Sequence, residues 1–426
     1  MDTTIIHVPR RYVREEWGGT ETVIQEISRR QQAAGWDPKI VTSMALAKHP
    51  RELIGGIPVE RHPHFYSYFG LRPDQRLALD KKGGNLLSFG LFRSLLREKG
   101  ARLFHAHALN RLGGTVAAAA RILGKPFVVS IHGGVFEVPA EEMEAMQLPV
   151  AGKFDWGRPF GALLGSRTLL ERADLVLCVG ENEARAARLR LGHDRIAHLP
   201  NGVDCQRFSG GNGFAFRKKH GIPETDFLVL NIARIDAQKN QLGLVEAFLQ
   251  LYASGRQQSR LVLIGPETQA DYARRLRERI ASSGLGDRIL LLPGLAPESA
   301  DLPDAYDACD VFAMPSAHEP FGIAALEAWS AGKAVVASAV GGLAGLIDDG
   351  RSGLLCRAPG DLARHLGNIY DSPAFARELG RAGREEARLR YDWSVIHDRL
   401  EALYATAEAR IARKNSPTFP IPARHV

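Results

Sequence analysis

Short runs of mostly apolar residues alternate along the chain with longer segments in which apolar residues recur at helical spacing. In the first half the apolar runs lie at 5–8, 103–107, 127–131 and 175–179. Runs this short, with few polar interruptions, are typical of parallel strands that are buried on both faces. Between them the sequence predicts helices over 21–32, 116–123 and 183–191. The alternation indicates a doubly wound α/β domain.

The second half repeats this pattern, with apolar runs at 227–232, 261–265, 289–295, 311–315 and 334–338. A chain of 426 residues is too long for one hydrophobic core, and domains of about 200 residues are the usual result. We therefore predict one domain over 1–203 and a second over 204–392. A long helix over 393–414 follows, and the tail over 415–426, which contains three prolines, is predicted to be loose.

Composition indicates a soluble globular protein, with 45% hydrophobic and 24% charged residues. No run approaches the roughly 18 apolar residues of a membrane-spanning helix. The chain begins directly on a strand-like segment without a signal-peptide pattern, so we expect a cytoplasmic protein. The four cysteines are scattered and form no C-x-x-C pair, which suggests neither a zinc site nor a disulfide framework.

The most informative stretch is His318-Glu319-Pro320-Phe321-Gly322-Ile323-Ala324-Ala325-Leu326-Glu327. It leads from the strand at 311–315 through a turn into a helix predicted over 323–331. The N–H groups of Gly322 and Ile323 then stand unpaired at a helix N-terminus, where phosphate groups bind readily. Glu327, two turns into the helix, can accept hydrogen bonds from hydroxyls. This order of groups suits a sugar joined to a diphosphate and a ribose, and a solvated helix with two unrelated glutamates is the alternative.

Two cations, Arg234 and Lys239, follow the strand at 227–232. They lie at the carboxyl end of a predicted parallel strand, where ligands bind in open α/β sheets. Together they can neutralise a diphosphate and stabilise it as it departs. The adjacent Asp348 and Asp349 are explained by turn chemistry, and we predict no metal site.

These motifs resemble those of the retaining glycosyltransferases of family 4, also called glycosyltransferase group 1, whose fold is GT-B. The glutamate string resembles the E-x7-E signature of that family. Arg234 and Lys239 resemble its R-x4-K pair for the donor phosphates, although Asn240 stands where the family usually has glycine. The corner at Gly294 and Leu295 resembles the place where the family seats the nucleotide base by backbone bonds.

Two features of the first half fit the same resemblance. Gly18 and Gly19 lie between the first strand and its helix, where the family has a loop that faces the donor diphosphate and the acceptor. His132 follows the strand at 127–131, where the family has a histidine near the reacting sugar. From the residues alone, the two glycines are equally a plain turn and His132 a capping or core histidine. His105 and His107, which alternate on a strand, are predicted to be structural.

The resemblance covers nearly the whole chain and implies two Rossmann-like doubly wound domains that face a central cleft. It also implies that the last helix crosses back onto the first domain. The expected reaction transfers a sugar from a nucleoside diphosphate sugar to an acceptor hydroxyl, with retention of the anomeric configuration. A catalytically silent GT-B protein that binds or scaffolds, or a membrane-surface adaptor, is the alternative.

The resemblance also assigns roles to residues. Glu319 binds hydroxyls of the donor sugar, Glu327 binds the ribose, and His132 orients or stabilises the sugar at its reacting carbon. The departing diphosphate is held by Arg234, Lys239 and the amides of Gly322 and Ile323, with Phe321 in the same turn. Because these groups supply the positive charge, no obligatory metal or other cofactor is expected.

The formal net charge of +7 favours anionic partners over nucleic acid, for which the chain carries no recognition motif. By resemblance, the acceptor is a carbohydrate or a lipid-linked intermediate of polysaccharide or glycolipid biosynthesis. Two irregular segments at 62–69 and 136–167 are rich in aromatic residues. They either face a sugar or lipid, with peripheral contact to an anionic inner membrane surface, or they pack internally. The amphipathic pattern at 85–99 likewise predicts an internal helix, with membrane contact as the alternative.

Overall fold

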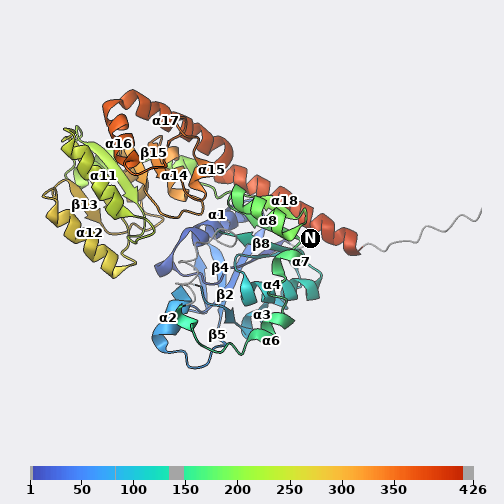
Figure 1. Cartoon of the computed structure of the whole chain (residues 1–426). Coiled ribbons are helices and arrows are strands. Elements are labelled where there is room, and N and C mark those ends of the chain that lie inside the picture. The colour runs from blue at the N-terminus through green and yellow to red at the C-terminus, as the bar shows by residue number, and fades with distance from the viewer. Residues whose placement is uncertain (1–2, 82, 134–147, 416–426) are drawn as a thin grey trace, which may run out of the picture. The chain divides into compact units, whose positions relative to one another are not determined.

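The computed structural model of the chain describes residues 3–81, 83–133 and 148–415, which form two compact units (Figure 1). Unit 1 contains the chain up to Cys178, the segment Glu183–Leu199 and the chain from His397 onward. Unit 2 contains Val179–Asn182 and Pro200–Ile396. The predicted loose tail from residue 416, and the part of the second aromatic segment at 136–147, lie outside the described residues.

Unit 1 is built on an eight-stranded sheet whose strand order is β10-β9-β8-β7-β1-β2-β4-β3. All neighbours pair in parallel except β3 with β4. The strands are β1 (Thr4–Val8), β2 (Asp37–Ser43), β3 (Arg51–Ile54), β4 (Ile57–His62), β7 (Ala101–Ala106), β8 (Phe127–Ile131), β9 (Leu175–Cys178) and β10 (Ile196–His198). The four predicted strands of the first half are confirmed as β1, β7, β8 and β9.

Helices of the first half connect these strands, and a longer loop follows β1. They are α1 (Gly19–Ala33), α2 (Pro73–Lys81), α3 (Phe89–Leu95), α4 (Asn110–Leu123), α6 (Arg158–Leu163), α7 (Leu169–Arg172) and α8 (Glu181–Leu191), with short 3₁₀ turns η1 (Arg14–Glu16) and η2 (Leu148–Val150). The core between sheet and helices is made by the apolar runs that the sequence singles out, such as Phe104, Val129 and Val176, all fully buried.

The single helix predicted over 85–99 is wrong. Leu86–Leu87 instead forms the short strand β6, which pairs with β5 (Phe65–Tyr66). Helix α3 begins only at Phe89, because the Oγ of Ser88 accepts a hydrogen bond from the N–H of Leu91 at 3.2 Å and caps the helix there. Both leucines of β6 are buried, so the apolar pattern reflects a buried strand followed by a short helix.

Unit 2 has a six-stranded parallel sheet in the order β13-β12-β11-β14-β15-β16. Its strands are β11 (Phe227–Ile232), β12 (Ser259–Ile264), β13 (Ile289–Leu292), β14 (Val311–Met314), β15 (Ala334–Ser338) and β16 (Leu354–Cys356). In order along the chain this is 3-2-1-4-5-6, the Rossmann order, and the strand order reverses between β11 and β14. The five strands predicted for this half are confirmed, with β13 ending three residues early.

The helices of unit 2 lie before, between and after these strands. They are α9 (Cys205–Ser209), α10 (Gly213–Lys219), α11 (Gln241–Ala253), α12 (Ala270–Ser282), α13 (Asp301–Ala308), α14 (Ile323–Ser330), α15 (Leu343–Leu346), α16 (Asp361–Asp371), α17 (Pro373–Glu386) and the π-helical turn η3 (Ala387–Tyr391). Trp329 of α14 and Phe312 of β14 are fully buried, so the helix that carries Glu327 is anchored in the core.

The last helix, α18 (Trp393–Asn415), belongs to unit 1 from His397 onward. Arg102 of β7 binds it through Glu401 at 2.7 Å and through both carboxylate oxygens of Glu408 at 2.6 and 3.2 Å. The same guanidinium lies 3.9 Å above the ring of Trp36, so the clamp combines charge with stacking. None of the described helices is both long enough and apolar enough to cross a bilayer.

Candidate active site

Residues predicted to bind the donor lie at the reversal of strand order in unit 2. Arg234 and Lys239 follow β11, and Glu319 follows the neighbouring strand β14. Ligands of open parallel sheets bind outside the carboxyl ends of the strands at such a reversal. The topology therefore places the two predicted motifs at the position where this class of sheet binds ligands.

The structure brings Lys239 and Glu319 into direct contact. The Nζ of Lys239 lies 2.6 Å from Oε2 of Glu319, and the two side chains are only 15% and 11% exposed. An ion pair this well shielded from water interacts more strongly than a surface pair. Glu319 is thus a carboxylate held in place by a cation from the neighbouring loop.

Arg234 is positioned differently, with 48% of its side chain exposed. Its Nη2 lies 3.3 Å from Oδ2 of Asp236, while its backbone carbonyl accepts a hydrogen bond from Nε2 of Gln241 at 2.8 Å. The backbone is therefore fixed by the start of α11 while the guanidinium remains accessible. This is the arrangement expected of a cation that meets an anionic ligand from solution.

Asn240, the departure from the family pattern, has a left-handed backbone with φ of +53°. Its Oδ1 accepts a hydrogen bond from the N–H of Gly243 at 3.2 Å and caps α11, and its Nδ2 donates to the carbonyl of Pro315 at 3.2 Å. Glycine and asparagine are the residues that adopt this conformation most readily. The replacement of glycine by asparagine therefore preserves the turn that positions Lys239.

Gly322 forms the tight turn into α14, with φ of +105°. A Cβ at this position would lie 2.5 Å from Cδ2 of Leu343, so a side chain is excluded by space as well as by backbone conformation. Phe321 is buried and packs edge-to-face on Tyr391 at 6.2 Å between ring centroids. The predicted helix start at Ile323 is confirmed, and the first N–H groups of α14 lie at this turn.

Gly341 and Gly342, after β15, support the loop that carries Glu319. The N–H of Gly342 donates to the carbonyl of Glu319 at 2.8 Å. A Cβ on Gly341 would lie 2.3 Å from that carbonyl oxygen, and its φ is +48°. The sequence shows a pair of glycines here, but only the fold reveals that they set the position of the glutamate backbone.

Glu327 is the fifth residue of α14, so it lies just over one turn into the helix and not two as predicted. Its Oε2 accepts a hydrogen bond from the hydroxyl of Tyr306 at 2.6 Å. Burial raises the pKa of Glu327 to about 7, against the opposing effects of the Tyr306 hydrogen bond and the positive charge of Arg207. The two glutamates of the string therefore differ, since one is paired with a lysine and the other is a poorly hydrated carboxyl.

The corner predicted to seat the nucleotide base follows β13. Leu295 is half-buried and packs against the core of unit 2. A Cβ on Gly294 would lie 2.7 Å from Cδ of Pro266, so this corner adjoins the turn after β12. Its backbone is thus close to the neighbouring strand end.

In unit 1, Gly18 and Gly19 form the start of α1. The N–H of Gly18 donates to Oε2 of Glu21 at 3.1 Å, and the helix begins at Gly19, two residues earlier than predicted. Burial raises the pKa of Glu21, and the nearby Arg11 opposes this shift. Gly18 and Gly19 therefore form a strand-to-helix turn in which Glu21 caps the helix.

His132 lines a cavity of about 250 Å³ at the carboxyl ends of β7 and β8. Thr20, the residue after the glycine pair, lines the same cavity, whereas Gly18 and Gly19 are not among its lining residues. Arg10 and Asn85 contribute further polar walls. The guanidinium of Arg10 donates to the carbonyls of Leu79, Asp80 and Lys81 at the end of α2, which fixes the loop before Asn85.

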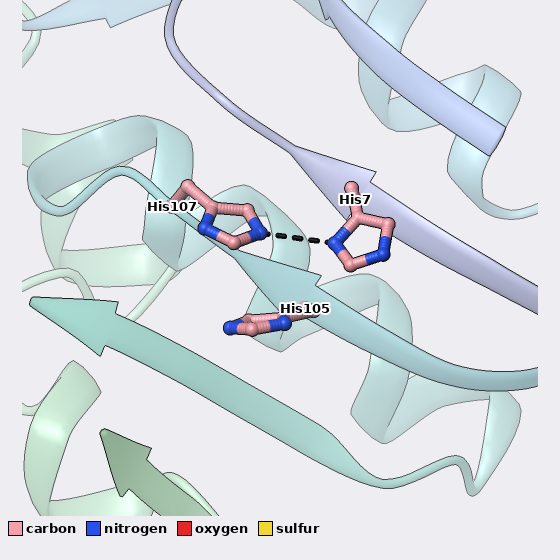
Figure 2. A group of neighbouring side chains, drawn as sticks. All are labelled: His7, His105 and His107. Atoms are coloured by element: carbon pink, nitrogen blue, oxygen red, sulfur yellow. Dashed lines mark hydrogen bonds between the residues drawn. The ribbon is translucent and has the colours of Figure 1, made fainter. Parts of the chain in front are cut away.

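Behind this cavity lies a cluster of buried histidines that includes His7, His105 and His107 (Figure 2). The Nδ1 of His107 lies 2.9 Å from Nε2 of His132, and its Nε2 lies 3.0 Å from Nδ1 of His7. Burial lowers the pKa of His132 and of His7 to about 4. The pKa values of His105 and His107 also fall well below the ordinary value because of burial, so all four rings are neutral near pH 7.

His107, which the sequence predicts to be structural, also borders the cavity. His107 lines the cavity and contacts His132, while His105 is fully buried and binds Ser130 and Tyr404. The spacing of two residues in the chain gave the two histidines the same strand face. The difference arises because β7 ends at Ala106, so His107 already belongs to the loop at the sheet edge.

Comparison with known proteins identifies the family of the chain. Residues 214–386 match the family described as glycosyl transferases group 1, and residues 17–207 match glycosyltransferase family 4. The D-inositol 3-phosphate glycosyltransferase of Stackebrandtia nassauensis is 30% identical over 416 residues, which cover 94% of this chain and 90% of that protein. A second relative, D-inositol 3-phosphate glycosyltransferase 1 of Catenulispora acidiphila, is 30% identical over 92% of this chain and 91% of its own.

Solved structures show the same fold. Anabaena Alr3699/HepE in complex with UDP has a TM-score of 0.71 at 20% identity, covering 95% of this chain and 100% of that one. Sucrose-phosphate synthase from Thermosynechococcus elongatus has a TM-score of 0.72 at 23% identity, covering 96% and 100%. The predicted fold class is confirmed, and the chain belongs to the group 1, family 4 glycosyltransferases with the GT-B fold.

Proposed function

We propose that this glycosyltransferase is a retaining hexosyltransferase that uses a nucleoside diphosphate sugar as donor. The observation that carries the proposal is the shielded Lys239–Glu319 pair at the strand reversal of unit 2, beside the N-terminus of α14. A cation, a carboxylate and a set of helix N–H groups at one sheet edge match the parts of a sugar diphosphate.

The ion pair gives the donor site a way to respond to its ligand. A diphosphate that reaches Lys239 competes with Glu319 for the ammonium group, and Arg234 and the N–H groups of Gly322 and Ile323 add further positive potential. Glu319 then has a carboxylate oxygen available for hydroxyls of the sugar. The same cations stabilise the diphosphate when it leaves.

We assign ribose binding to Glu327. Its carboxylate is fixed by the hydroxyl of Tyr306, and burial raises its pKa. A carboxylate in such surroundings gains from hydroxyl donors that replace lost water. Leu295 supplies the neighbouring backbone for the base.

We propose that transfer occurs on one face of the sugar and retains its configuration. The bond from the acceptor oxygen to the anomeric carbon forms as the bond to the diphosphate breaks, and the departing phosphate oxygen takes the proton of the acceptor hydroxyl. His132 contacts the reacting sugar in this scheme. The product anomer, read by NMR coupling constants, tests this step, and an inverted product would refute it.

Because Arg234 and Lys239 supply positive charge at the diphosphate, we propose that no metal is obligatory. Transfer should continue in EDTA at a rate close to that of the untreated enzyme. A complete loss that added Mg²⁺ or Mn²⁺ restores would contradict this.

A nucleotide-binding panel tests the donor site directly. UDP, GDP, ADP and CDP would be added without metal to the wild type, to Glu327→Ala and to Lys239→Met, with the exposed Glu246→Ala as control. A ligand at a hundred times its dissociation constant adds about 2.7 kcal/mol of stability, which gives a visible thermal shift. UDP is the first candidate, since the Anabaena protein of similar fold is solved with UDP and with UDP-glucose.

The proposal requires one nucleotide to stabilise the wild type and the Glu246→Ala control but not the two site variants. If no nucleotide binds and no donor is hydrolysed, the silent-scaffold alternative is the correct one.

For the acceptor we propose a carbohydrate or lipid-linked hydroxyl compound, with a role in polysaccharide or glycolipid biosynthesis. An acceptor panel should include inositol 3-phosphate, because the 30% identical relative is named for that substrate. Transfer to soluble sugars or sugar phosphates alone would refute the lipid-linked part of the proposal.

The aromatic segments support contact with a membrane surface. The structure joins them into one aromatic surface in unit 1, where Phe69 stacks on Phe154 at 6.2 Å and Phe65 stacks on Trp156 at 5.8 Å. Phe69, Phe89 and Phe154 are 64%, 59% and 68% exposed, so internal packing does not account for them. Exposed Arg158 and partly buried Lys153 adjoin these rings in the chain.

Aromatic rings next to cations favour an anionic lipid surface, and we propose a cytoplasmic enzyme that docks peripherally at the inner face. In a flotation assay, the wild type should float with vesicles in which about one third of the lipid is phosphatidylglycerol. The double variant Phe69→Ser, Phe154→Ser should lose this binding. Leu189→Ser, which replaces an exposed apolar residue elsewhere in unit 1, is the control. Equal flotation of the two variants would exclude this surface.

A further inference from the structure

Four buried or half-buried side chains of unit 1 form a continuous hydrogen-bonded array that ends at the cavity. The Oε1 of Gln31, on α1, lies 2.8 Å from Nε2 of His7 on β1. The Nδ1 of His7 lies 3.0 Å from Nε2 of His107, and Nδ1 of His107 lies 2.9 Å from Nε2 of His132. We call these four residues the histidine array.

A metal ion is the first alternative to consider, because one nitrogen each of His7, His105 and His107 lie within 4.8 Å of one another (Figure 2). Every ring nitrogen of these three residues already has a partner, however. His105 is bound at Nδ1 by the hydroxyl of Tyr404 at 2.6 Å and at Nε2 by Oγ of Ser130 at 2.7 Å. A metal would have to break several of these bonds, so the array accounts for the cluster better.

The array has a direction that Gln31 sets. A carbonyl oxygen only accepts, so Nε2 of His7 carries the proton and its Nδ1 is an acceptor. Nε2 of His107 must then donate to His7, and its Nδ1 must accept from Nε2 of His132. Within the described residues, Nδ1 of His132 makes no hydrogen bond, so this nitrogen keeps a lone pair for a ligand.

The opposite orientation of the Gln31 amide would reverse every tautomer. The structure places Oε1 of Gln31 toward His7 and leaves its Nε2 without a hydrogen-bond partner among the described residues. The tautomer spectra proposed below distinguish the two orientations.

The array does not conduct protons through the protein. A neutral amide takes up no proton at ordinary pH, so a proton passed from His132 to His107 and His7 would have no acceptor at the far end. Because the Gln31 carbonyl can only accept, the hydrogen bonds that follow from it can hold each histidine of the array in one tautomer.

We propose that Gln31, His7 and His107 are positioning residues that hold His132 as the neutral tautomer with its proton on Nε2. His132 then meets a substrate hydroxyl in the cavity as a hydrogen-bond acceptor at Nδ1. The role toward a substrate rests on the proposed function, whereas the tautomer is a property of the free protein.

Long-range ¹H–¹⁵N correlation spectra of the full chain, labelled at histidine nitrogens, test the tautomer at pH 7.5. His7, His107 and His132 should each show the neutral pattern with hydrogen on Nε2, and single His→Phe variants assign the signals. In Gln31→Leu the fixed end is lost, and the His132 signals should shift to those of a mixture of tautomers.

His107→Phe and His105→Phe are a matched pair, since both remove a buried imidazole from the same cluster. Only the first breaks the array. His107→Phe should therefore change the His132 tautomer and lower the turnover number of transfer about tenfold, as loss of one hydrogen bond to the substrate would, with the nucleotide thermal shift unchanged. His105→Phe should leave the His132 signals as in the wild type, whatever it costs in stability.

Three results would overturn the proposal: His132 with its proton on Nδ1 or on both nitrogens, a His132 tautomer that is the same in Gln31→Leu, or one equivalent of metal in protein purified without chelator. Failure of the proposed function can be distinguished from failure of the histidine array. Absence of transfer with the predicted tautomers would leave the array standing, and transfer with a different tautomer would leave the function standing.

Discussion

Asn240 combines a left-handed backbone with an N-cap, and the two effects can be separated by substitution. Asn240→Gly keeps the backbone conformation and should cost only a few tenths of a kcal/mol, about the value for loss of a cap to glycine. Asn240→Ala loses both and should lower the free energy of unfolding by about 2 kcal/mol. Urea denaturation followed at unit 2 measures the difference.

Asn212 is the matched control for this test. It caps α10 by accepting from the N–H of Ala215 at 3.0 Å, but its φ is −113°. Asn212→Ala should therefore cost only the cap, about 1 kcal/mol. Equal losses for the two alanine variants would mean that the left-handed turn at residue 240 contributes nothing.

Glu327 should make donor binding depend on pH near neutrality. Its pKa is raised to about 7, chiefly by burial, and the ribose hydroxyls need the carboxylate form as acceptor. Affinity for a nucleoside diphosphate sugar should therefore fall as pH decreases below about 7, approaching tenfold per pH unit, and level off above about 8. Isothermal titration with the sugar nucleotide, whose diphosphate does not titrate in this range, measures the effect.

Glu327→Gln provides the comparison, since it cannot titrate. Its binding should be weaker at pH 8 and independent of pH from about 6 to about 8. The same pH slope in the variant would assign the titration to another group.

Among the structural elements, the turn after β15 positions a residue that lies elsewhere in the sequence. Gly341→Ala places a methyl group 2.3 Å from the carbonyl oxygen of Glu319 if nothing moves, so the Glu319 loop must shift. We expect a loss of stability of about 1–3 kcal/mol and a loss of nucleotide binding of at least about tenfold. Thermal melts with and without nucleotide measure both.

Gly350→Ala is the control for backbone strain. Its φ is +81°, yet a Cβ there meets no atom within 4 Å. It should lose stability and keep nucleotide affinity. If both variants bind nucleotide as the wild type does, the turn does not position the donor site.

At the C-terminal helix, Arg102 should stabilise the docking of α18 more than any exposed pair does. Its side chain is 9% exposed and binds two glutamates as well as the Trp36 ring. Arg102→Lys keeps the charge but loses the two-pronged bond and the stacking, and should lower the local stability of α18 by about 1–2 kcal/mol. Hydrogen exchange of the α18 amides reports this without assuming two-state unfolding.

Arg410→Lys serves as control. Arg410 binds Asp194 on the same helix surface, but the two side chains are 32% and 83% exposed. Such a pair contributes about 0–1 kcal/mol, so exchange should hardly change. Faster exchange in this variant to the same extent would show that charge alone holds the helix.

At the scale of the whole molecule, the buried His7 of unit 1 and Glu327 of unit 2 should contribute to the acid response with opposite signs. The pKa of His7 is lowered to about 4 in the folded state, so the unfolded chain binds protons first and unit 1 loses stability as pH falls from about 6.5 to about 4. For His7 alone the loss is on the order of 3 kcal/mol. The raised pKa of Glu327 acts with the opposite sign, because the folded state binds its proton first and unit 2 gains stability as pH falls through 7.

Hydrogen exchange at pH 7 and pH 5, corrected for intrinsic rates, should therefore show protection lost in β1 and β7 before β11 and β14. His7→Asn should reduce the change in unit 1 and leave unit 2 as it is, since His105, His107 and His132 keep their lowered pKa values. Equal loss in both units, or none in unit 1, would contradict the assignment of neutral buried histidines.

Much of the fold follows from local patterns. Apolar runs such as 227–232 and 334–338 form strands with the predicted bounds, since runs this rich in apolar residues are stabilised by burial on both faces of a parallel sheet. The glutamate string and the Arg234–Lys239 pair were recognisable because glycine, proline and charge occupy fixed positions in contiguous sequence. The segment 85–99 shows where pattern fails, since a buried two-residue strand and a capped helix together imitate one amphipathic helix.

The sequence by itself therefore predicted the alternation of strands and helices, the family, and the motifs at Arg234–Lys239 and Glu319–Glu327. Tertiary structure decided which of these residues meet: Lys239 with Glu319, Gly341 with the Glu319 carbonyl, and His7 with His107. These contacts join segments far apart in the chain, and they depend on which strands become neighbours in the sheet. Burial was decided at the same level, and burial is what raises the pKa of Glu327 and keeps the histidines neutral.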